Sequence, residues 1–433
     1  MLWGLIVQGT ALYWITDVTC VGWAALTCYH ALYVALFGAL WSRLKNDVSR
    51  ILLWAALEWM RQSFYCGSPW GQLAQGLAPW PILIQLSSLG GILLVSFWVL
   101  GVNVFLLRSL FCAKKFLKTK AGMLTGIALL FPLIFGVLRL TQEDKKADSI
   151  FRMAIVQPNI PPDFKWSPKS EKAQLDWMEG LSRRFSKGSV DVLVWPETAL
   201  LDDPRLNPLV YTRFRALCTD LDCQLMIGAY DRLRIPGKNF NGVFLLDSGK
   251  SPLAVYHKIN LVPFGETIPF EKYFPFLKHC TPIEQSFQQG DTLPLFSFGE
   301  KITFAPLICF EDTLSSFVRK CVRNGAEILV TLSNDGWFRG SLGPVSHDFV
   351  ARFRAVENGL PLIRCTNTGV SSWVDRKGRE IQKISEFGKE VEVVGVMLCE
   401  VPVRQKTETV FGWLGYAWIL LLAVTGRKLG KLF

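Results

Sequence analysis

The chain has 433 residues, of which 50% are hydrophobic and only 19% are charged, a balance that excludes a disordered or wholly soluble protein. Its 47 Lys and Arg against 36 Asp and Glu give a formal net charge of +11. Much of the excess lies beside apolar segments, because residues 1–140 hold ten basic and three acidic residues and three more basic residues follow Thr409. The charge therefore indicates membrane topology, and we expect no nucleic-acid partner.

Six apolar stretches approach the roughly 20 residues that a bilayer-spanning helix needs. They lie at 1–16, 18–42, 51–66, between the Gly/Pro loop 67–81 and Arg108, at 121–138 and at 409–426. Glu58 and Arg61 interrupt the third stretch. We interpret them as a mutually neutralising pair, with a lipid head-group contact as the alternative.

The loops between these stretches differ in charge. Nearly all Lys and Arg of these regions lie in the loops 42–50 and 108–120 and after residue 426, whereas the loops 17–20 and 67–81 contain none. By the positive-inside rule, the first group faces the cytoplasm. The sequence thus predicts that residues 141–408 lie outside the cytoplasm.

Residues 141–408 show a different pattern, in which short β-rich runs are bounded by Pro, Gly, Asn and Asp. Helical patterns at 171–185, 206–222 and 346–358 separate several of them, which predicts an α/β domain with two sheets. The predicted strands are 151–156, 190–195, 224–229, 242–246, 253–257, 302–309, 326–332, 362–366, 370–374 and 391–397.

Three of these runs end at a reactive side chain. The first ends at Glu197 after a Trp-Pro pair, the second is followed by Lys258, and the third ends at Cys309, just before Glu311. Because ligands bind outside the carboxyl ends of strands in open α/β sheets, we expect the three to share one rim. Together they supply a thiol nucleophile, a base for its proton and a cation for a developing oxyanion. A cysteine beside a lysine and at a helix start is expected to have a lowered pKa.

Four ordered blocks carry a resemblance to a known family: residues 195–197 (Trp-Pro-Glu), Lys258 with 260–266, residues 309–311 (Cys-Phe-Glu) and residues 333–338. They resemble the Glu-Lys-Cys signature of the nitrilase superfamily and, with the flanking apolar stretches, its apolipoprotein N-acyltransferase family. The resemblance implies a nitrilase-like αββα four-layer sandwich inserted into a polytopic helical membrane domain. Its parts would be a membrane domain at 1–140, a catalytic domain at 141–408, and a last span with a basic tail at 409–433.

The resemblance also implies roles for individual residues. Glu197 would be the general base, Lys258 the stabiliser of the oxyanion and Cys309 the nucleophile. Supporting positions would be Glu266, Glu311, Phe310 and Asn334, and substrate contacts would come from Trp166, Trp337 and Phe338. Residues 273–276 are a further candidate for dipping into the membrane. The family commonly has Tyr where this chain has Phe310, which removes a hydroxyl contact, and it usually carries one or two more membrane helices before the segment that matches residue 1.

The implied activity is the last step of lipoprotein maturation. An acyl chain would pass from a membrane phospholipid, through a thioester on the cysteine, to the N-terminal amine of a diacylglyceryl-cysteine apolipoprotein, on the periplasmic side of a bacterial inner membrane. No cofactor or metal is expected, and the sequence has neither a GxxxxGK[ST] nor an HExxH motif. The alternatives are a membrane-tethered nitrilase-type amidase and a non-catalytic lipid-binding scaffold.

Overall fold

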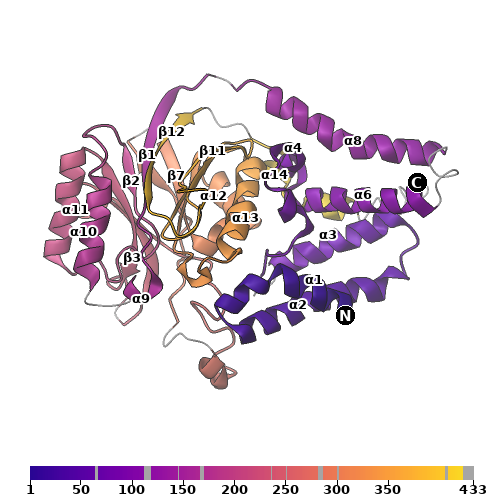
Figure 1. The fold of residues 1–433 in the computed structure, drawn as a ribbon, viewed down its shortest axis with the longest axis horizontal. Helices are drawn as coiled ribbons and strands as arrows, with labels where there is room; N and C mark the ends of the chain where they lie inside the picture. The colour runs from indigo at the N-terminus through magenta and orange to yellow at the C-terminus, as the bar shows by residue number, and fades with distance from the viewer. Residues whose placement is uncertain are drawn as a thin grey trace.

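A helical part and a layered α/β part lie side by side in the computed structural model (Figure 1). The structure describes residues 1–63, 67–111, 119–144, 146–165, 170–235, 237–249, 251–280, 286–299, 302–404 and 408–422. The helical part consists of α1 (Leu2–Ala11), η1 (Tyr13–Asp17), α2 (Cys20–Trp41), α3 (Asp47–Ser63), η2 (Leu73–Leu77), α4 (Pro81–Ile84), α5 (Ser87–Gly90), α6 (Ile92–Phe111), α8 (Lys120–Thr141) and α14 (Val410–Leu414).

Helices occur at each of the six apolar stretches, but they differ in length. Among the described residues, α2 and α6 are the two helices that are long and apolar enough to cross a membrane. The ten residues of α1 span about 15 Å, half the hydrocarbon thickness of a bilayer. The last stretch is interrupted at Gly415, where φ is 59°. A polytopic arrangement therefore stays a prediction.

Two six-stranded mixed sheets form the centre of the α/β part. The first has the order β12 (Gly395–Val403), β1 (Ser149–Gln157), β2 (Val192–Val194), β3 (Gln224–Asp231), β4 (Phe240–Leu246), β5 (Ala254–His257). The second has the order β11 (Glu380–Lys383), β10 (Ser372–Val374), β9 (Leu362–Thr366), β8 (Ile328–Ser333), β7 (Ile302–Ile308), β6 (Phe296–Phe298).

Both sheets follow the same plan. Each has three neighbouring parallel strands, β1, β2 and β3 in one and β7, β8 and β9 in the other. One antiparallel strand flanks each set on one side, and a hairpin of two strands flanks it on the other. The carboxyl ends of the parallel strands therefore gather at one edge of each sheet, as an α/β ligand site requires.

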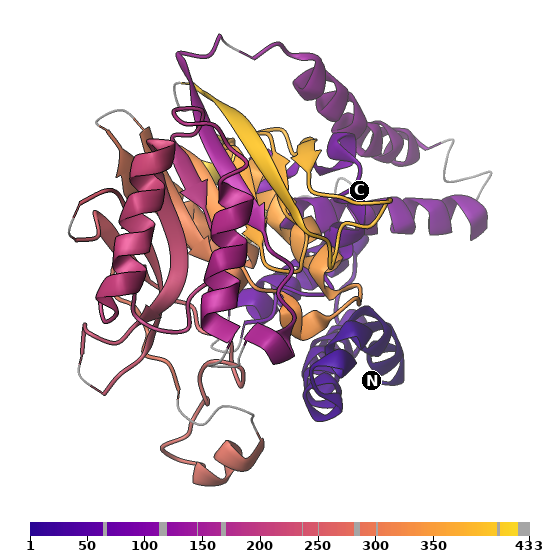
Figure 2. The same ribbon diagram turned by 60° about the vertical axis from the view of Figure 1, so that its left-hand side comes forward.

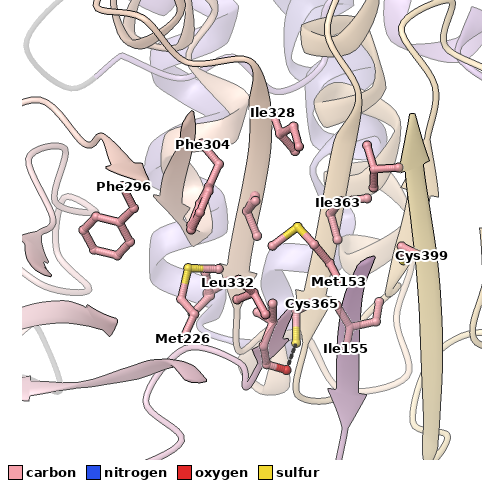
Figure 3. Packing of buried hydrophobic residues seen from close by; sticks show 14 of the residues in the cluster. Met153, Ile155, Met226, Phe296, Phe304, Ile328, Leu332, Ile363, Cys365 and Cys399 are labelled. Atoms are coloured by element: carbon pink, nitrogen blue, oxygen red, sulfur yellow. Dashed lines mark hydrogen bonds between the residues drawn. The ribbon is translucent and has the colours of Figure 1, made fainter. Parts of the chain in front are cut away.

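The layers are held by three apolar interfaces. Alternate residues of β1, such as Met153 and Ile155, meet Phe304, Leu332 and Ile363 of the other sheet (Figure 3). Helices α10 (Glu171–Ser182) and α11 (Pro208–Leu221) cover the outer face of the first sheet (Figure 2). Helices α12 (Ser315–Arg323) and α13 (Gly343–Asn358) cover the second. The result is the expected nitrilase-like order of helix, sheet, sheet and helix layers.

Helix α13 also joins the α/β part to the helical part. Ala351 and Ala355 face the second sheet, whereas Phe353 and Val356 join an apolar cluster with α3, η2 and α6. A helix that is apolar on opposite faces needs cover on both. The Glu357 carboxylate completes the junction by accepting a hydrogen bond of 2.8 Å from the backbone N–H of Ile92. The α/β layers are thereby packed directly against the helices.

Each of the ten predicted strands overlaps a strand of the structure, although β12 begins at Gly395, later than expected. The sequence missed β6 and β11, which have three and four residues and give too short a pattern to detect. It also missed α12, whose nine residues follow the Cys309 loop without a side-chain cap.

Candidate active site

The three predicted catalytic residues leave the carboxyl ends of three strands. Glu197 follows β2, Lys258 follows β5 directly, and Cys309 begins the 3-10 turn η5 (Cys309–Thr313) immediately after β7. Strand β5 runs parallel to β2, because two antiparallel pairings separate it from β3. The first sheet thus brings its carboxylate and its ammonium to the same edge.

A glycine allows the turn at Glu197 to lie on the sheet. A Cβ at Gly228 of β3 would stand 2.6 Å from the Glu197 Cα and from the Pro196 carbonyl oxygen, a separation that real Cβ atoms do not show. The turn itself has Thr198 at φ 49°. Gly228 was not singled out from the sequence, because an isolated glycine in a strand does not say which segment approaches it.

Lys258 lies between two carboxylates and is only 1% exposed. Its Nζ is 3.5 Å from Glu197 Oε1 and donates to Glu266 at 2.9 Å. Burial alone would lower the pKa of Lys258, but Glu266 and Glu197 raise it above its ordinary value. The amide of Asn241 donates to Glu197 Oε1 at 2.8 Å and to Glu266 Oε1 at 3.0 Å. Lys258 is thus a fixed cation, and Asn241 is a site residue that the sequence analysis missed.

The other oxygen of Glu197 is held from the second sheet. The backbone N–H of Asn334 donates to Glu197 Oε2 at 3.0 Å. Lys165, at the end of α9 (Pro162–Lys165), is buried and donates to the Glu197 carbonyl at 3.1 Å and to Asn334 Oδ1 at 3.2 Å. Burial lowers the pKa of Lys165 to about 7, although Glu197 acts in the opposite direction. Three contacts to its carboxylate and one to its backbone carbonyl therefore fix the candidate base in one orientation.

Glu311 ties the Cys309 turn to the Lys258 loop. Its fully buried carboxylate accepts from Tyr256 Oη at 2.7 Å, from the backbone N–H of Ile259 and Asn260 at 2.9 and 3.0 Å, and from Ile308 N at 2.9 Å. Cys309 itself has a positive φ of 50°, an uncommon conformation for a residue with a side chain. The buried carboxylate thus sets the relation between the candidate nucleophile and the candidate cation.

The structure corrects the expected acidity of Cys309. Burial and the neighbouring Glu197 carboxylate raise the pKa of its thiol well above the usual value, while Lys258 and a hydrogen bond with Ser333 act in the opposite direction. The expectation of a lowered pKa was wrong, because it counted Lys258 without the burial of the thiol and the nearby Glu197 carboxylate. The resting side chain is a neutral thiol that needs a base to take its proton.

A second group of charged residues lies beside the thiol. One ligand atom each of Cys309, Asp335 and His347 lies within 4.8 Å of the others, a spacing that would suit a metal ion. However, both ring nitrogens of His347 already bond carboxylates, those of Asp335 at 3.0 Å and Asp312 at 2.8 Å. Arg364 forms an ion pair with Asp312 and adds positive charge. These contacts make the group an ion cluster, since neither ring nitrogen has a lone pair free for a metal.

Aromatic residues from both parts of the molecule surround this edge. Phe338, in η6 (Gly336–Phe338), meets Trp14 of η1 with ring centroids 4.9 Å apart, and Trp14 meets Trp70 at 5.2 Å. Phe310 packs against the same cluster. Trp337 is 51% exposed, and Trp166 lies outside the described residues. The candidate site therefore lies beside an apolar cluster to which the helical part contributes.

Comparisons with known proteins agree with this geometry. Residues 152–401 match the Carbon-nitrogen hydrolase family, and residues 1–105 match the Apolipoprotein N-acyltransferase N-terminal domain. The chain is 33% identical over 402 residues to the apolipoprotein N-acyltransferase of Geobacter metallireducens, covering 87% of this chain and 76% of the relative. The Photobacterium profundum relative of the same name is 29% identical over 89% of this chain and 78% of its own.

Among solved structures, an amidase of the nitrilase superfamily from Nesterenkonia is similar with a TM-score of 0.43 and 18% identity, over 60% of this chain and 92% of the amidase.

Proposed function

The chain belongs to the apolipoprotein N-acyltransferase family and is an acyltransferase that N-acylates lipoproteins, and we propose that it does so through a thioester on Cys309. The acyl donor is a membrane phospholipid, and the acceptor is the α-amine of a diacylglyceryl-cysteine. One observation carries the proposal: Glu197, Lys258 and Cys309 leave three strand ends and meet at one edge, with the Lys258 ammonium 3.5 Å from the Glu197 carboxylate.

The first half-reaction loads the cysteine. Glu197 takes the proton of the neutral thiol while the sulfur attacks the ester carbonyl, and a C–S bond forms. Lys258 stabilises the oxyanion, together with the backbone N–H of Phe310, which lies in the first turn of η5, where a helix leaves N–H groups without an internal acceptor. The C–O bond to the glycerol then breaks, and Glu197 returns the proton to the departing lysophospholipid alkoxide.

The second half-reaction transfers the acyl chain from Cys309 to the acceptor. The neutral α-amine of the acceptor attacks the thioester carbonyl, and Lys258 again faces the oxyanion. The C–S bond breaks, the amine loses a proton to Glu197, and this proton returns the sulfur to a thiol. No external energy source is needed, since the energy of the ester is kept in the thioester.

We place residues 1–140 and 409–433 in a bacterial inner membrane and the catalytic residues 141–408 on its periplasmic side. The apolar helices α2 and α6 and the distribution of Lys and Arg support this division. An acyl chain gains about 0.8 kcal/mol for every CH₂ kept out of water, so the site must receive it close to the bilayer. We assign Phe338 and Trp337 to its path.

An exposed aromatic loop supports the same placement. Tyr273 is 73% exposed, and Phe270, Phe274 and Phe276 are each more than half exposed. The salmon loop that carries them projects from the α/β part beside the first helices (Figure 1). A soluble surface rarely gathers so many exposed aromatic rings, and we assign the loop to the membrane interface.

The side of the membrane on which the α/β part lies can be tested by labelling introduced cysteines. Lys187→Cys places a thiol on an exposed turn of the α/β part, and Lys45→Cys places one in the basic loop 42–50. A membrane-impermeant maleimide added to intact spheroplasts should label the first and not the second. The reverse pattern would contradict the periplasmic placement.

The mechanism is tested by changing the nucleophile. Purified Cys309→Ala and Cys309→Ser should lose N-acylation of a diacylglyceryl lipopeptide by at least a thousandfold, measured by mass spectrometry with phospholipid as donor. The matched control, Cys223→Ala, removes a half-buried thiol on another surface and should keep full activity.

Without acceptor, the wild-type Cys309 peptide should carry one hydroxylamine-labile acyl chain. Acylation that persists in Cys309→Ala would overturn the thioester mechanism. Release of ammonia from small amides, without lipopeptide acylation, would favour the amidase alternative.

A further inference from the structure

One ion cluster lies next to Cys309 and has no part in the steps above. Its centre is His347, which lies in the first turns of α13 and is 1% exposed. Its Nδ1 is 3.0 Å from Asp335 Oδ1 and its Nε2 is 2.8 Å from Asp312 Oδ1. An ionised carboxylate can only accept and a neutral imidazole has one N–H, so only an imidazolium satisfies both contacts. Burial alone would lower the pKa of His347, but Asp312 and Asp335 raise it to about 9.

The two aspartates belong to the two loops that matter for the reaction. Asp312 lies in η5, the turn that begins with Cys309. Asp335 follows Asn334, whose backbone N–H holds Glu197 Oε2 at 3.0 Å. His347 therefore connects the turn of the nucleophile to the loop that orients the base.

The charges around His347 balance only when it is protonated. The groups that face it are Asp312 from η5, Asp335 from the loop after β8 and Arg364 from β9. Arg364 forms an ion pair with Asp312 and lies 3.8 Å from Asp335. Arg364 also lies 3.6 Å from Asp348, whose carboxylate is paired with Arg352. Asp312 and Asp335 therefore share the charge of Arg364, and the imidazolium supplies the second positive charge that they need. The ring of Trp70, which contacts His347 at 5.7 Å, adds no charge.

Cys309 is close enough to sense this balance. Its Sγ lies within 4.8 Å of ligand atoms of both Asp335 and His347. Asp335 raises the pKa of the thiol. A positive charge at a similar distance acts in the opposite direction.

We propose that His347 is a positioning residue for acyl transfer: its imidazolium joins the Cys309 turn to the Glu197 loop and offsets the charge of Asp335 beside the thiol. This inference rests on the proposed role of Cys309 as nucleophile. Neutral His347 would leave the thiol harder to ionise and the two loops without their link.

The test uses His347→Gln in the full-length enzyme in detergent. Gln keeps one donor and one acceptor but cannot be a cation or donate to both aspartates. At pH 8, alkylation of Cys309 by iodoacetamide, followed on the Cys309 peptide by mass spectrometry, should slow at least tenfold. The kcat of N-acylation should fall about 10- to 100-fold, while KM for phospholipid and lipopeptide stays within twofold.

The control is Glu357→Gln, at the other end of the same helix. It removes an equally buried charge at the junction with Ile92, so it should lower the unfolding temperature without slowing alkylation of Cys309. A purely structural role for His347 predicts that the two variants behave alike.

A double variant separates charge from structure. Adding Asp335→Asn to His347→Gln removes the negative charge that the imidazolium offsets, and alkylation should return to within threefold of wild type. Unchanged alkylation in folded His347→Gln, or a further slowing in the double variant, would overturn the inference. The two failures can be told apart, because alkylation of Cys309 is measured without any lipid substrate and does not depend on the proposed function. If Cys309→Ala still N-acylates the lipopeptide, it is the proposed function that fails.

Discussion

The two parts of the molecule both bury ionisable residues, but they satisfy them differently. In the α/β part, Lys258 contacts Glu197 and Glu266, and the Asn241 amide donates to both carboxylates. Their other oxygens accept from the backbone N–H groups of Asn334 and Val262. In the helical part, Glu58 accepts from the backbone N–H of Leu73 at 3.0 Å.

Within the part of the chain that the structure describes, the side chain of Arg61, one turn further along α3, contacts Gln8 and His30, at 3.4 and 3.3 Å. Among the described residues no ion pair joins Arg61 to Glu58, and Arg61 Nε and Nη2, His30 Nε2 and Glu58 Oε2 are buried without a hydrogen-bond partner. The predicted neutralisation of Arg61 by Glu58 therefore acts through space and not through a direct ion pair. Strand ends and the loops that follow them have free backbone N–H groups that can donate to a buried charge. In a helix, most backbone N–H groups already donate to carbonyls of the same helix.

The largest difference between the two parts should appear in catalysis. Glu197→Gln keeps the shape of the base but removes its capacity to take a proton, and it sets an amide against the donors of Asn241, Asn334 and Lys258. Acylation of Cys309 should slow at least a thousandfold, measured as the single-turnover rate of acyl-enzyme formation without acceptor.

The control for Glu197→Gln changes another buried carboxylate, which lies in the loop after the same strand, β2. Asp203→Asn removes a buried carboxylate that pairs with Arg205, and acyl-enzyme formation should stay within about twofold. Equal losses in the two variants would mean that Glu197 acts through stability alone.

A smaller effect concerns pH. The folded pKa of His347 is raised from 6.5 to about 9, so protonation stabilises the native state. This contribution is fully present below about pH 6.5 and is lost as pH rises through 9, and it amounts to on the order of 3 kcal/mol. Thermal unfolding in detergent should therefore show a stability gap between wild type and His347→Gln that is widest near pH 6 and narrows by pH 9.5. A gap that is constant with pH would show that the imidazole is not charged in the native state.

The smallest effect is expected in the helical part. The double variant Glu58→Gln/Arg61→Met removes two buried charges whose hydrogen bonds are incomplete, and it should change the free energy of unfolding by about 1 kcal/mol or less. Its counterpart, Lys258→Met/Glu266→Gln, breaks a fully paired network and should cost about 3 kcal/mol. Chemical denaturation of both in the same detergent checks this. Equal costs would mean that Arg61 binds a partner, and the lipid head-group alternative would gain support.

Much of the α/β part could be predicted because its pattern is local. The run 192–194 is apolar, Pro196 stops it, and a carboxylate follows, all within six residues. The same holds for 302–308 and Cys309. The end of a strand is determined by a few neighbouring residues. The strand ends, and the three candidate catalytic residues that follow them, could therefore be predicted from the sequence.

Other site residues carry no local signal. Asn241 is one polar residue in the fully buried strand β4, and Lys165 ends a four-residue helix. Each becomes a site residue only because the fold places it against Glu197, 44 and 32 positions away in sequence. The same holds for the ion cluster, in which His347 comes from α13, Asp312 from η5 and Arg364 from β9. Their spacing in the sequence does not predict that they lie together.

Sequence alone determined which residues could do chemistry and where each strand would present them, since alternation of apolar and polar side chains is set by neighbours along the chain. Tertiary structure alone decided the charge state of those residues. The pKa of Cys309 depends on burial and on four groups from distant segments, Glu197, Lys258, Asp335 and Ser333. Electrostatic energy follows distance in space and local solvation, which the order of residues does not contain.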